Sequence, residues 1–94
     1  MALNKDHLRQ LRGMCHQLKP IVTLGQKGLT ETVAVEIDQA LAQHELIKVK
    51  LRGDRDQRAH WVNAIGQASG ADLIQQIGHT ACFFRAKPDQ SASV

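Results

Sequence analysis

Aromatic residues are scarce in this chain, which has one tryptophan, two phenylalanines and no tyrosine among its 94 residues. A surface on which several nucleic-acid bases stack therefore has few candidate side chains, and we expect Trp61 in the core. The cysteines Cys15 and Cys82 are too few for a disulfide framework, and both occupy positions suited to small apolar residues. We expect two buried, reduced thiols.

Long hydrophobic runs are also missing. No segment approaches the roughly 20 apolar residues of a membrane-spanning helix, and the first residues lack the apolar run of a signal peptide. These absences predict a cytoplasmic protein that does not bind membranes. The length suits one small domain, expected over residues 1–86 and as a monomer, and the polar segment 87–94 is expected to be a flexible tail.

Catalytic and metal-binding patterns are not found either. Cys15 and His16 are neighbours on a predicted helix, so their side chains point about 100° apart and do not form a nucleophile and base. The histidines are scattered without the paired spacing of a zinc site, and the glycine loop lacks the Lys-Ser/Thr ending of a P-loop. The sequence therefore predicts no enzyme, no metal ion and no cofactor.

Positive and negative charges are separated along the chain, although the formal net charge is only +3. Residues 1–28 carry a net charge of +4, residues 29–45 carry −4 without any Lys or Arg, and residues 46–58 carry +3. Such separation suits one surface for a polyanion and another for water, but charge blocks are often only solvated surface. The charge pattern leaves both interpretations open.

The most informative motif is the loop Gly25-Gln26-Lys27-Gly28, which follows the apolar run 21–24 and precedes a helix-patterned segment. Two glycines three residues apart let the backbone adopt positive φ and approach a ligand without interference from Cβ atoms. The first amides of the following helix point free donors in the same direction. The loop therefore indicates an anion-binding turn, although many such turns use glycine only to turn.

Apolar spacing predicts a first helix from about Asn4 to Leu18, stopped by Pro20. Its apolar side carries Leu8, Leu11, Cys15 and Leu18. A basic stripe lies one residue later along the same helix, and its members are Lys5, Arg9, Arg12, His16 and Lys19. A solvated helix face explains this stripe as readily as an anion-binding surface does.

Two further helices are predicted. One covers residues 31–44, with Thr30 as N-cap, an acidic outer side, and an inward stripe of Val33, Ile37, Ala40 and Leu41. The other begins after Asp54, a candidate N-cap, and places Trp61, Val62, Ile65 and Ala68 on its inward side.

Strict alternation over residues 47–52 predicts a strand with three aliphatic side chains on one face and three cations, which we expect to be exposed, on the other. Residues 73–77 and 81–85 predict a final hairpin around Gly78-His79. The order α-β-α-β-α-β-β predicts a two-layer α/β fold, in which the second and third helices share one face of the sheet. The position of the first helix is left open.

Several of these segments together resemble the CRM domain (chloroplast RNA splicing and ribosome maturation), in its bacterial single-domain YhbY form. The segments are residues 18–30, residues 44–51 and the closing stretch from Ile77-Gly78 to Phe84-Arg85, in the order of that family. The family's usual Leu-Tyr-Arg is Phe83-Phe84-Arg85 in this chain, so any role of the tyrosine hydroxyl is in doubt.

The resemblance implies a fold similar to the C-terminal domain of translation initiation factor 3, with a mixed four-stranded sheet in the order 1-2-4-3. It also implies a non-enzymatic protein that binds ribosomal RNA on precursors of the large ribosomal subunit, centred on the glycine loop. We expect Arg9, Arg12 and Lys19 of the basic stripe to supply charge beside this loop. With the basic strand added, the expected RNA-binding residues are Lys5, Arg9, Arg12, Lys19, Gly25, Gln26, Lys27, Gly28, Lys48, Lys50 and Arg52.

The scarcity of aromatic residues favours recognition of structured RNA by its shape and backbone over reading of splayed bases. A different class of function is also open. The acidic outer side of the second helix suits an adaptor that binds a basic ribosomal protein on the assembling ribosome.

Overall fold

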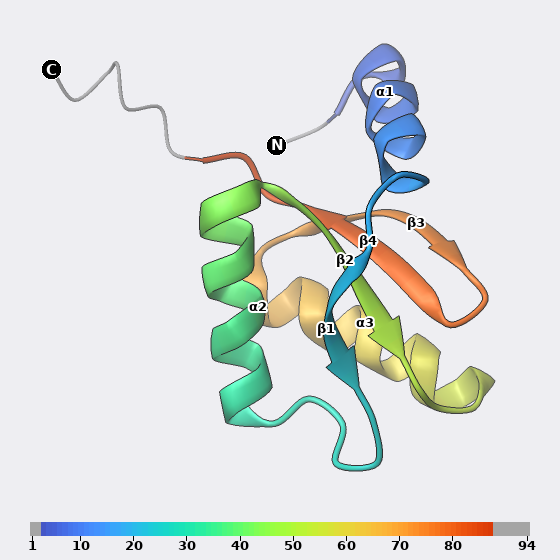
Figure 1. The fold of residues 1–94 in the computed structure, drawn as a ribbon, viewed down its shortest axis with the longest axis vertical. Helices are drawn as coiled ribbons and strands as arrows, with labels where there is room; N and C mark the ends of the chain where they lie inside the picture. The colour runs from blue at the N-terminus through green and yellow to red at the C-terminus, as the bar shows by residue number, and fades with distance from the viewer. Residues whose placement is uncertain (1–2, 88–94) are drawn as a thin grey trace, which may run out of the picture.

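The order of helices and strands is the predicted α-β-α-β-α-β-β in the computed structural model, which describes residues 3–87 (Figure 1). The elements are α1 (Lys5–Cys15), β1 (Pro20–Leu24), α2 (Glu31–His44), β2 (Leu46–Leu51), α3 (Arg55–Ser69), β3 (Asp72–Ile77) and β4 (Thr80–Phe84). Most of the predicted tail, residues 88–94, lies outside the described residues. At its first residue, the Lys87 amide donates a hydrogen bond to Glu45 Oε2 at 2.8 Å.

The four strands form one mixed sheet in the order β1-β2-β4-β3, as predicted. β1 and β2 run parallel, and β4 is antiparallel to both β2 and β3. Because the carboxyl ends of parallel strands meet at one edge of a sheet, the links that follow β1 and β2 leave the sheet side by side. The Arg52 amide confirms this arrangement by donating to the Leu24 carbonyl at 2.8 Å.

Both predicted helix caps are confirmed. Thr30 Oγ1 accepts a hydrogen bond from the Val33 amide at 3.2 Å at the start of α2. Asp54 and Gln57 form a capping box at the start of α3, in which each side chain accepts from the other's amide, at 2.8 and 2.9 Å. Each cap satisfies amides that lack a partner within the helix, a contribution of about 1 kcal/mol.

The first helix ends at Cys15, three residues before its predicted end. The Gln17 and Leu18 amides bond to carbonyls only three residues earlier, which tightens the chain beyond the helix. This tighter turn ends the helical backbone before Lys19, because a proline such as Pro20 disfavours helical backbone in the residue that precedes it. Leu18 keeps its predicted apolar contact and packs against the side chains beneath α1.

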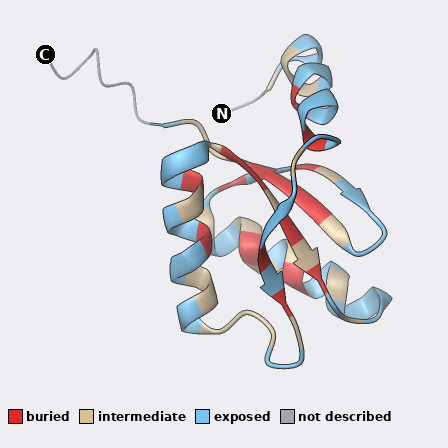
Figure 2. Ribbon diagram, in the orientation of Figure 1, coloured by how far each residue is buried: buried red, intermediate tan, exposed pale blue. Residues whose placement is uncertain are grey.

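The main core lies between the sheet and the pair α2 and α3, which share one face as predicted (Figure 2). Phe83 of β4 is completely buried in its centre, between strand residues such as Val49 and the inward side chains Ile37 and Ile65. Ala68 of α3 is exposed, contrary to the prediction, since the inward side continues from Ile65 to Ser69 at four-residue spacing.

A smaller core lies on the opposite face of the sheet, where α1 packs against β2 and β3. Its buried residues are Leu11, Cys15, Leu46, Ile74, Cys82 and Phe84. The helix whose position the sequence left open therefore adds a partial third layer to the predicted two-layer arrangement. Because α1 covers part of this face of β2, Lys48 and Lys50 are half-buried, contrary to the expected exposure, whereas Arg52 beyond the strand is exposed.

Cys15 and Cys82 are both buried and free, as predicted. They belong to the same small core, and burial raises the pKa of the Cys82 thiol to about 12, with a further rise from its hydrogen bond to Cys15. A thiol with so high a pKa stays protonated at neutral pH, and the thiolate is the reactive form of cysteine. The pair therefore serves packing.

This thiol predicts a loss of stability in alkali. An unfolded cysteine ionises near pH 9.0, whereas folded Cys82 keeps its proton until about pH 12. The unfolded state is thus the first to lose a proton as the pH rises. The free energy of unfolding is expected to fall by about 1 kcal/mol per pH unit across this interval, with the full contribution present below pH 9. Urea denaturation at several pH values would measure the slope. The Cys82→Ala variant should be less stable, but its free energy of unfolding should not fall with pH in this way. An equal fall in the variant would show that Cys82 is not its cause.

Candidate functional site

The glycine loop forms a tight turn at the carboxyl end of β1 (Figure 1). The Gly28 amide donates to the Gly25 carbonyl at 2.8 Å, and the Thr30 amide donates to the Gly28 carbonyl at 3.1 Å. Gln26 and Lys27 are exposed at the tip, as a ligand-contacting loop requires. The backbone is therefore held by its own hydrogen bonds before any ligand arrives.

The two glycines of this loop are present for different reasons. Gly28 has a φ of +69°, and a Cβ atom there would lie 3.0 Å from Trp61 Nε1. Gly25 does not have positive φ, which corrects the sequence prediction, and a Cβ atom there would meet nothing within 4 Å. The fold thus requires glycine at position 28, whereas it leaves open space at position 25.

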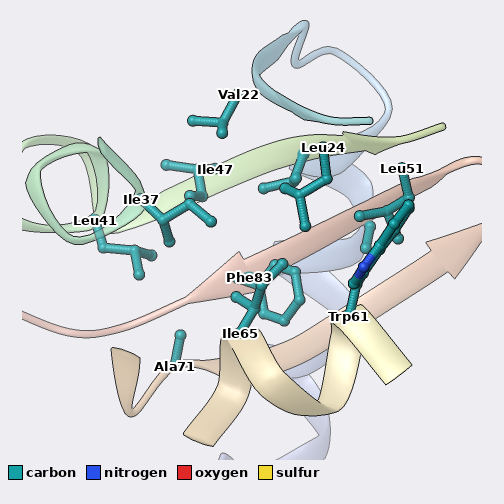
Figure 3. Close-up of a cluster of buried hydrophobic side chains, with 12 residues drawn as sticks. Val22, Leu24, Ile37, Leu41, Ile47, Leu51, Trp61, Ile65, Ala71 and Phe83 are labelled. Atoms are coloured by element: carbon teal, nitrogen blue, oxygen red, sulfur yellow. The ribbon is translucent and has the colours of Figure 1, made fainter. Parts of the chain in front are cut away.

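Trp61 is buried, as predicted, but at the rim of the core and directly beneath the loop (Figure 3). The far edge of its ring meets a second glycine, because a Cβ atom on Gly53 would lie 2.7 Å from Trp61 Cη2. One indole ring therefore supports both the β1–α2 loop and the β2–α3 link. Gly28 lies at one edge of the indole ring and Gly53 at the other, so the two segments are about one ring length apart.

Arg58 and the β3–β4 turn complete this end of the molecule. Arg58 Nη1 donates to the Gly53 carbonyl at 2.8 Å and lies 3.0 Å from His79 Nε2. Because a guanidinium has only donors, His79 Nε2 accepts. The Leu51 amide in turn donates to the His79 carbonyl at 2.6 Å. We call this assembly the loop end, and it comprises the segments 25–28, 52–58 and 78–79.

The loop end brings together some predicted site residues and adds others. Lys27 and Arg52 are exposed there beside Gly25. Arg55 is exposed in the first turn of α3, and with Arg58 it was not among the predicted residues. The parallel order of β1 and β2 was the signal that could have found both arginines, since it brings the start of α3 beside the loop.

The basic stripe of α1 lies far from the loop, at the other end of the long axis (Figure 1). Lys19 precedes the five-residue strand β1 and Gly25 follows it, so six residue steps, or about 20 Å of extended chain, separate them. Lys5, Arg9 and Lys19 are exposed, as an anion-binding stripe requires. The expectation that this stripe lies beside the glycine loop is nevertheless wrong.

Arg12 has a structural contact as well. Its Nε donates to the Ile74 carbonyl at 3.3 Å. Ile74 is the residue where β3 and β4 shift register, so this carbonyl lies at an irregularity of the sheet. Arg12 therefore helps to fasten α1 to the edge strand, and its replacement would affect packing together with charge.

The sheet separates the charges of the molecule. The side that carries α1 presents Lys5, Arg9, Lys48 and Lys50 with Asp6 as the acidic residue of α1. The opposite side carries α2, whose acidic residues are Glu31, Glu36 and Asp38, and α3, whose cations Arg55 and Arg58 lie at the loop end. Within residues 3–87 the one ion pair joins Arg85 and Asp38 at 2.7 Å, so the cations of the α1 side are not neutralised by pairing.

The loop end is more mixed in charge. Its cations are Lys27, Arg52, Arg55 and Arg58, and the acidic residues Glu31, Asp54 and Asp56 lie in or beside the first turns of α2 and α3. Asp54 is occupied as a cap. Any anion bound there would therefore depend on close contact with the loop backbone and on Lys27 at its tip, more than on net charge.

The different roles of the two glycines predict different stabilities for their alanine variants. Gly28→Ala is expected to lower the free energy of unfolding by about 2 kcal/mol, because positive φ is unfavourable for alanine and the new methyl group crowds Trp61. Gly25→Ala should change it by less than about 0.5 kcal/mol. Thermal and urea denaturation of both variants measure the difference. Equal losses would show that position 25 is also constrained by the fold.

Two further findings concern other kinds of site. Among residues 3–87, no three His, Cys, Asp or Glu side chains gather into a group that could hold a metal ion. No helix in that range combines the length and apolar character needed to cross a bilayer.

Comparison with known proteins gives concordant matches. The model of the CRS1/YhbY (CRM) domain matches residues 3–85. An RNA-binding protein of Haemophilus influenzae is 45% identical over 94 residues, covering 99% of this chain and 93% of the relative. A Pseudomonas aeruginosa protein named "Probable RNA-binding protein" is 40% identical over 89 residues, covering 94% and 86% of the two chains.

A solved structure agrees with the fold. The solution structure of a hypothetical Staphylococcus aureus protein, proposed to bind RNA, superposes with a TM-score of 0.80 at 28% identity, covering 95% of this chain and 94% of the other. Sequence and three-dimensional similarity thus extend over nearly the whole chain. The chain belongs to the CRS1/YhbY (CRM) domain family.

Proposed function

We propose that this protein binds structured RNA without catalysing a reaction, through the loop end and the α1 side of the sheet. The observation that carries the proposal is the separation of charge by the sheet, with unpaired cations on the α1 side and the acidic helix α2 on the other. The names of the relatives, which describe RNA-binding proteins, support the choice of RNA as the polyanion.

In this proposal the RNA lies along the α1 side and ends at the loop. Lys48 and Lys50 extend from β2 between the two regions, so they provide contacts between the α1 stripe and the loop. At the loop, the backbone around Gly25 and the Lys27 ammonium approach one phosphate. Because these groups contact phosphate and not base edges, they fix the position of the RNA without reading its sequence.

The proposed ligand is ribosomal RNA within precursors of the large ribosomal subunit. The protein binds it in the cytoplasm. Contacts about 20 Å apart suit a folded RNA, whose backbone has a fixed path, better than a flexible single strand. The aromatic residues agree with this choice, since Trp61, Phe83 and Phe84 are all buried and unavailable for stacking.

The alternative function, an adaptor that uses the acidic side of α2, has less support. Asp38 is held by Arg85 through an ion pair, and Glu45 beyond the helix accepts from the Lys87 amide. Asp38, one of the three carboxylates of α2, is therefore engaged within the chain. No observation favours this function over RNA binding.

Sedimentation of the tagged protein through a ribosome gradient tests the proposal. We expect it in the fractions of precursor large subunits, and we expect its release as the salt concentration rises, because binding to phosphates releases counterions. Protein that remains at the top of the gradient, or that sediments only with small subunits, would contradict the proposed function.

The Gly25→Ala variant then tests the position of the contact. If the RNA backbone approaches the open space at Gly25, the added methyl group should lower RNA affinity several-fold while stability is unchanged. Unchanged affinity in this folded variant would show that the loop backbone is not approached.

A further inference from the structure

A hollow of about 340 Å³ opens between the end of α1, the start of β1 and the end of α2. This volume is at the lower limit of typical ligand pockets, about 300–1,000 Å³. Its walls are mainly apolar and include Met14, Leu18, Ile21 and Leu46. Lys19, His44 and Lys48 provide the polar part of the lining.

Two apolar walls of the hollow are open to water. Met14 is 48% exposed and Ile21 is 52% exposed, and both are among the few large hydrophobic residues that the described chain leaves uncovered. Ile21 is exposed where β1 shifts register against β2 between Pro20 and Val22. An exposed apolar surface with a polar margin is typical of an interaction site.

The charges of the lining indicate what kind of segment fits. Lys19 and Lys48 are cationic, no carboxylate lines the hollow, and neither lysine forms an ion pair within residues 3–87. The complementary ligand therefore carries carboxylates or phosphates beside an apolar group. The imidazole of His44 is the one aromatic ring in the lining, so an RNA base would find a single stacking partner, whereas an aliphatic side chain would find Met14, Leu18 and Ile21.

The hollow shares Lys19 and Lys48 with the proposed RNA surface, so the two ligands would compete for these lysines, but it reaches α1 on the side away from Arg9 and Arg12. Successive residues of a helix are about 100° apart, which places Met14 on one side of the buried residues Leu11 and Cys15, and Arg9 and Arg12 on the other. A partner in the hollow and an RNA along the basic stripe would therefore approach α1 from different sides.

We propose that this hollow docks an acidic segment of a partner protein, which seats a leucine-sized side chain against Met14 and Ile21 and places carboxylates near Lys19 and Lys48. This binding function is additional to RNA binding and does not rest on it. A second hollow next to the first shares Met14, His44 and Leu46, but it is also lined by Glu45, so the carboxylates of the segment are confined to the first hollow.

The test uses a synthetic acidic peptide of Glu and Asp residues with a central pair of leucines, added to the full-length, isotope-labelled protein. Two-dimensional NMR should show shifts at the amides of Met14, Leu18, Ile21 and Lys48. The double variant Met14→Ser/Ile21→Ser should bind about tenfold more weakly or worse. Val35→Ser is the matched control, since Val35 is 50% exposed on α2 outside the hollow, and it should bind the peptide normally.

Matched probes identify the outcomes that overturn the proposal. A peptide with serines in place of the leucines should bind much more weakly. Equal binding of the two peptides would show that charge attraction alone, without the apolar walls of the hollow, accounts for the affinity. The proposal also fails if the acidic peptide shifts only Lys27 and Arg52 at the loop end. It fails if an unpaired oligouridine shifts the amides of the hollow and the peptide does not. Sedimentation equilibrium of the free protein must show a monomer, because self-association through the hollow would make a second copy its occupant.

Discussion

Trp61→Ala is expected to lower the free energy of unfolding by about 3–5 kcal/mol, a large share of the stability of a domain of this size. The substitution removes the ring that packs against Gly28 on one edge and Gly53 on the other. No neighbouring side chain can fill the space without moving one of these two links. Urea denaturation followed by far-ultraviolet circular dichroism measures the loss, since the variant no longer contains a tryptophan.

Trp61→Phe provides the control for this prediction. Phenylalanine keeps the ring in the core but is too short to support both links at once, so we expect a smaller loss of stability and a looser loop. If Trp61→Ala were as stable as the unmodified protein, the ring would be a peripheral contact. The proposed support of the loop end would then be wrong.

Reversing charge at the loop end is expected to have the largest effect on RNA binding. Lys27→Glu and Arg52→Glu should each weaken binding by about tenfold at moderate salt, and together by about a hundredfold, because each replaces attraction to phosphate by repulsion. Each should also make the salt dependence shallower by about one phosphate contact. Both side chains are exposed, so circular dichroism and melting temperature should change little.

Lys87→Glu is the matched control for either single reversal. Lys87 is exposed beyond β4, and the reversal changes the net charge of the protein by the same amount. A similar loss of RNA affinity in Lys87→Glu would mean that net charge, and not the loop end, determines binding. Normal affinity in the folded Lys27→Glu/Arg52→Glu protein would remove the loop end from the RNA site.

The sequence predicted the elements well because their signals are local. Thr30 and Asp54 are caps that act within one helical turn, and the alternation over residues 47–52 reports directly which face of β2 is buried. The sheet order was implied by the resemblance and is confirmed. The position of α1 was not predictable, because its apolar stripe would fit either face of the sheet until the small core around Ile74 and Phe84 is known.

The candidate site was harder to predict because it depends on contacts between distant segments. No local pattern indicates that Gly28 and Gly53, 25 positions apart in the sequence, meet the same indole ring. The charges of Arg55 and Arg58 were visible in the sequence, but their position beside the loop follows only from the parallel pairing of β1 and β2. Periodicity correctly grouped the α1 cations with one another and gave no information about their distance from Lys27.

The shared indole also restricts how this end of the molecule can vary during evolution or be redesigned. A side chain at position 28 or 53 would crowd Trp61 and so disturb the other link. Gln26, Lys27 and Arg55 are exposed, so their replacement should leave the fold unchanged while it alters ligand binding. The side chains that project from the two links can therefore change the ligand preference one at a time. The backbones of the two links, in contrast, can change only together, because both pack against Trp61.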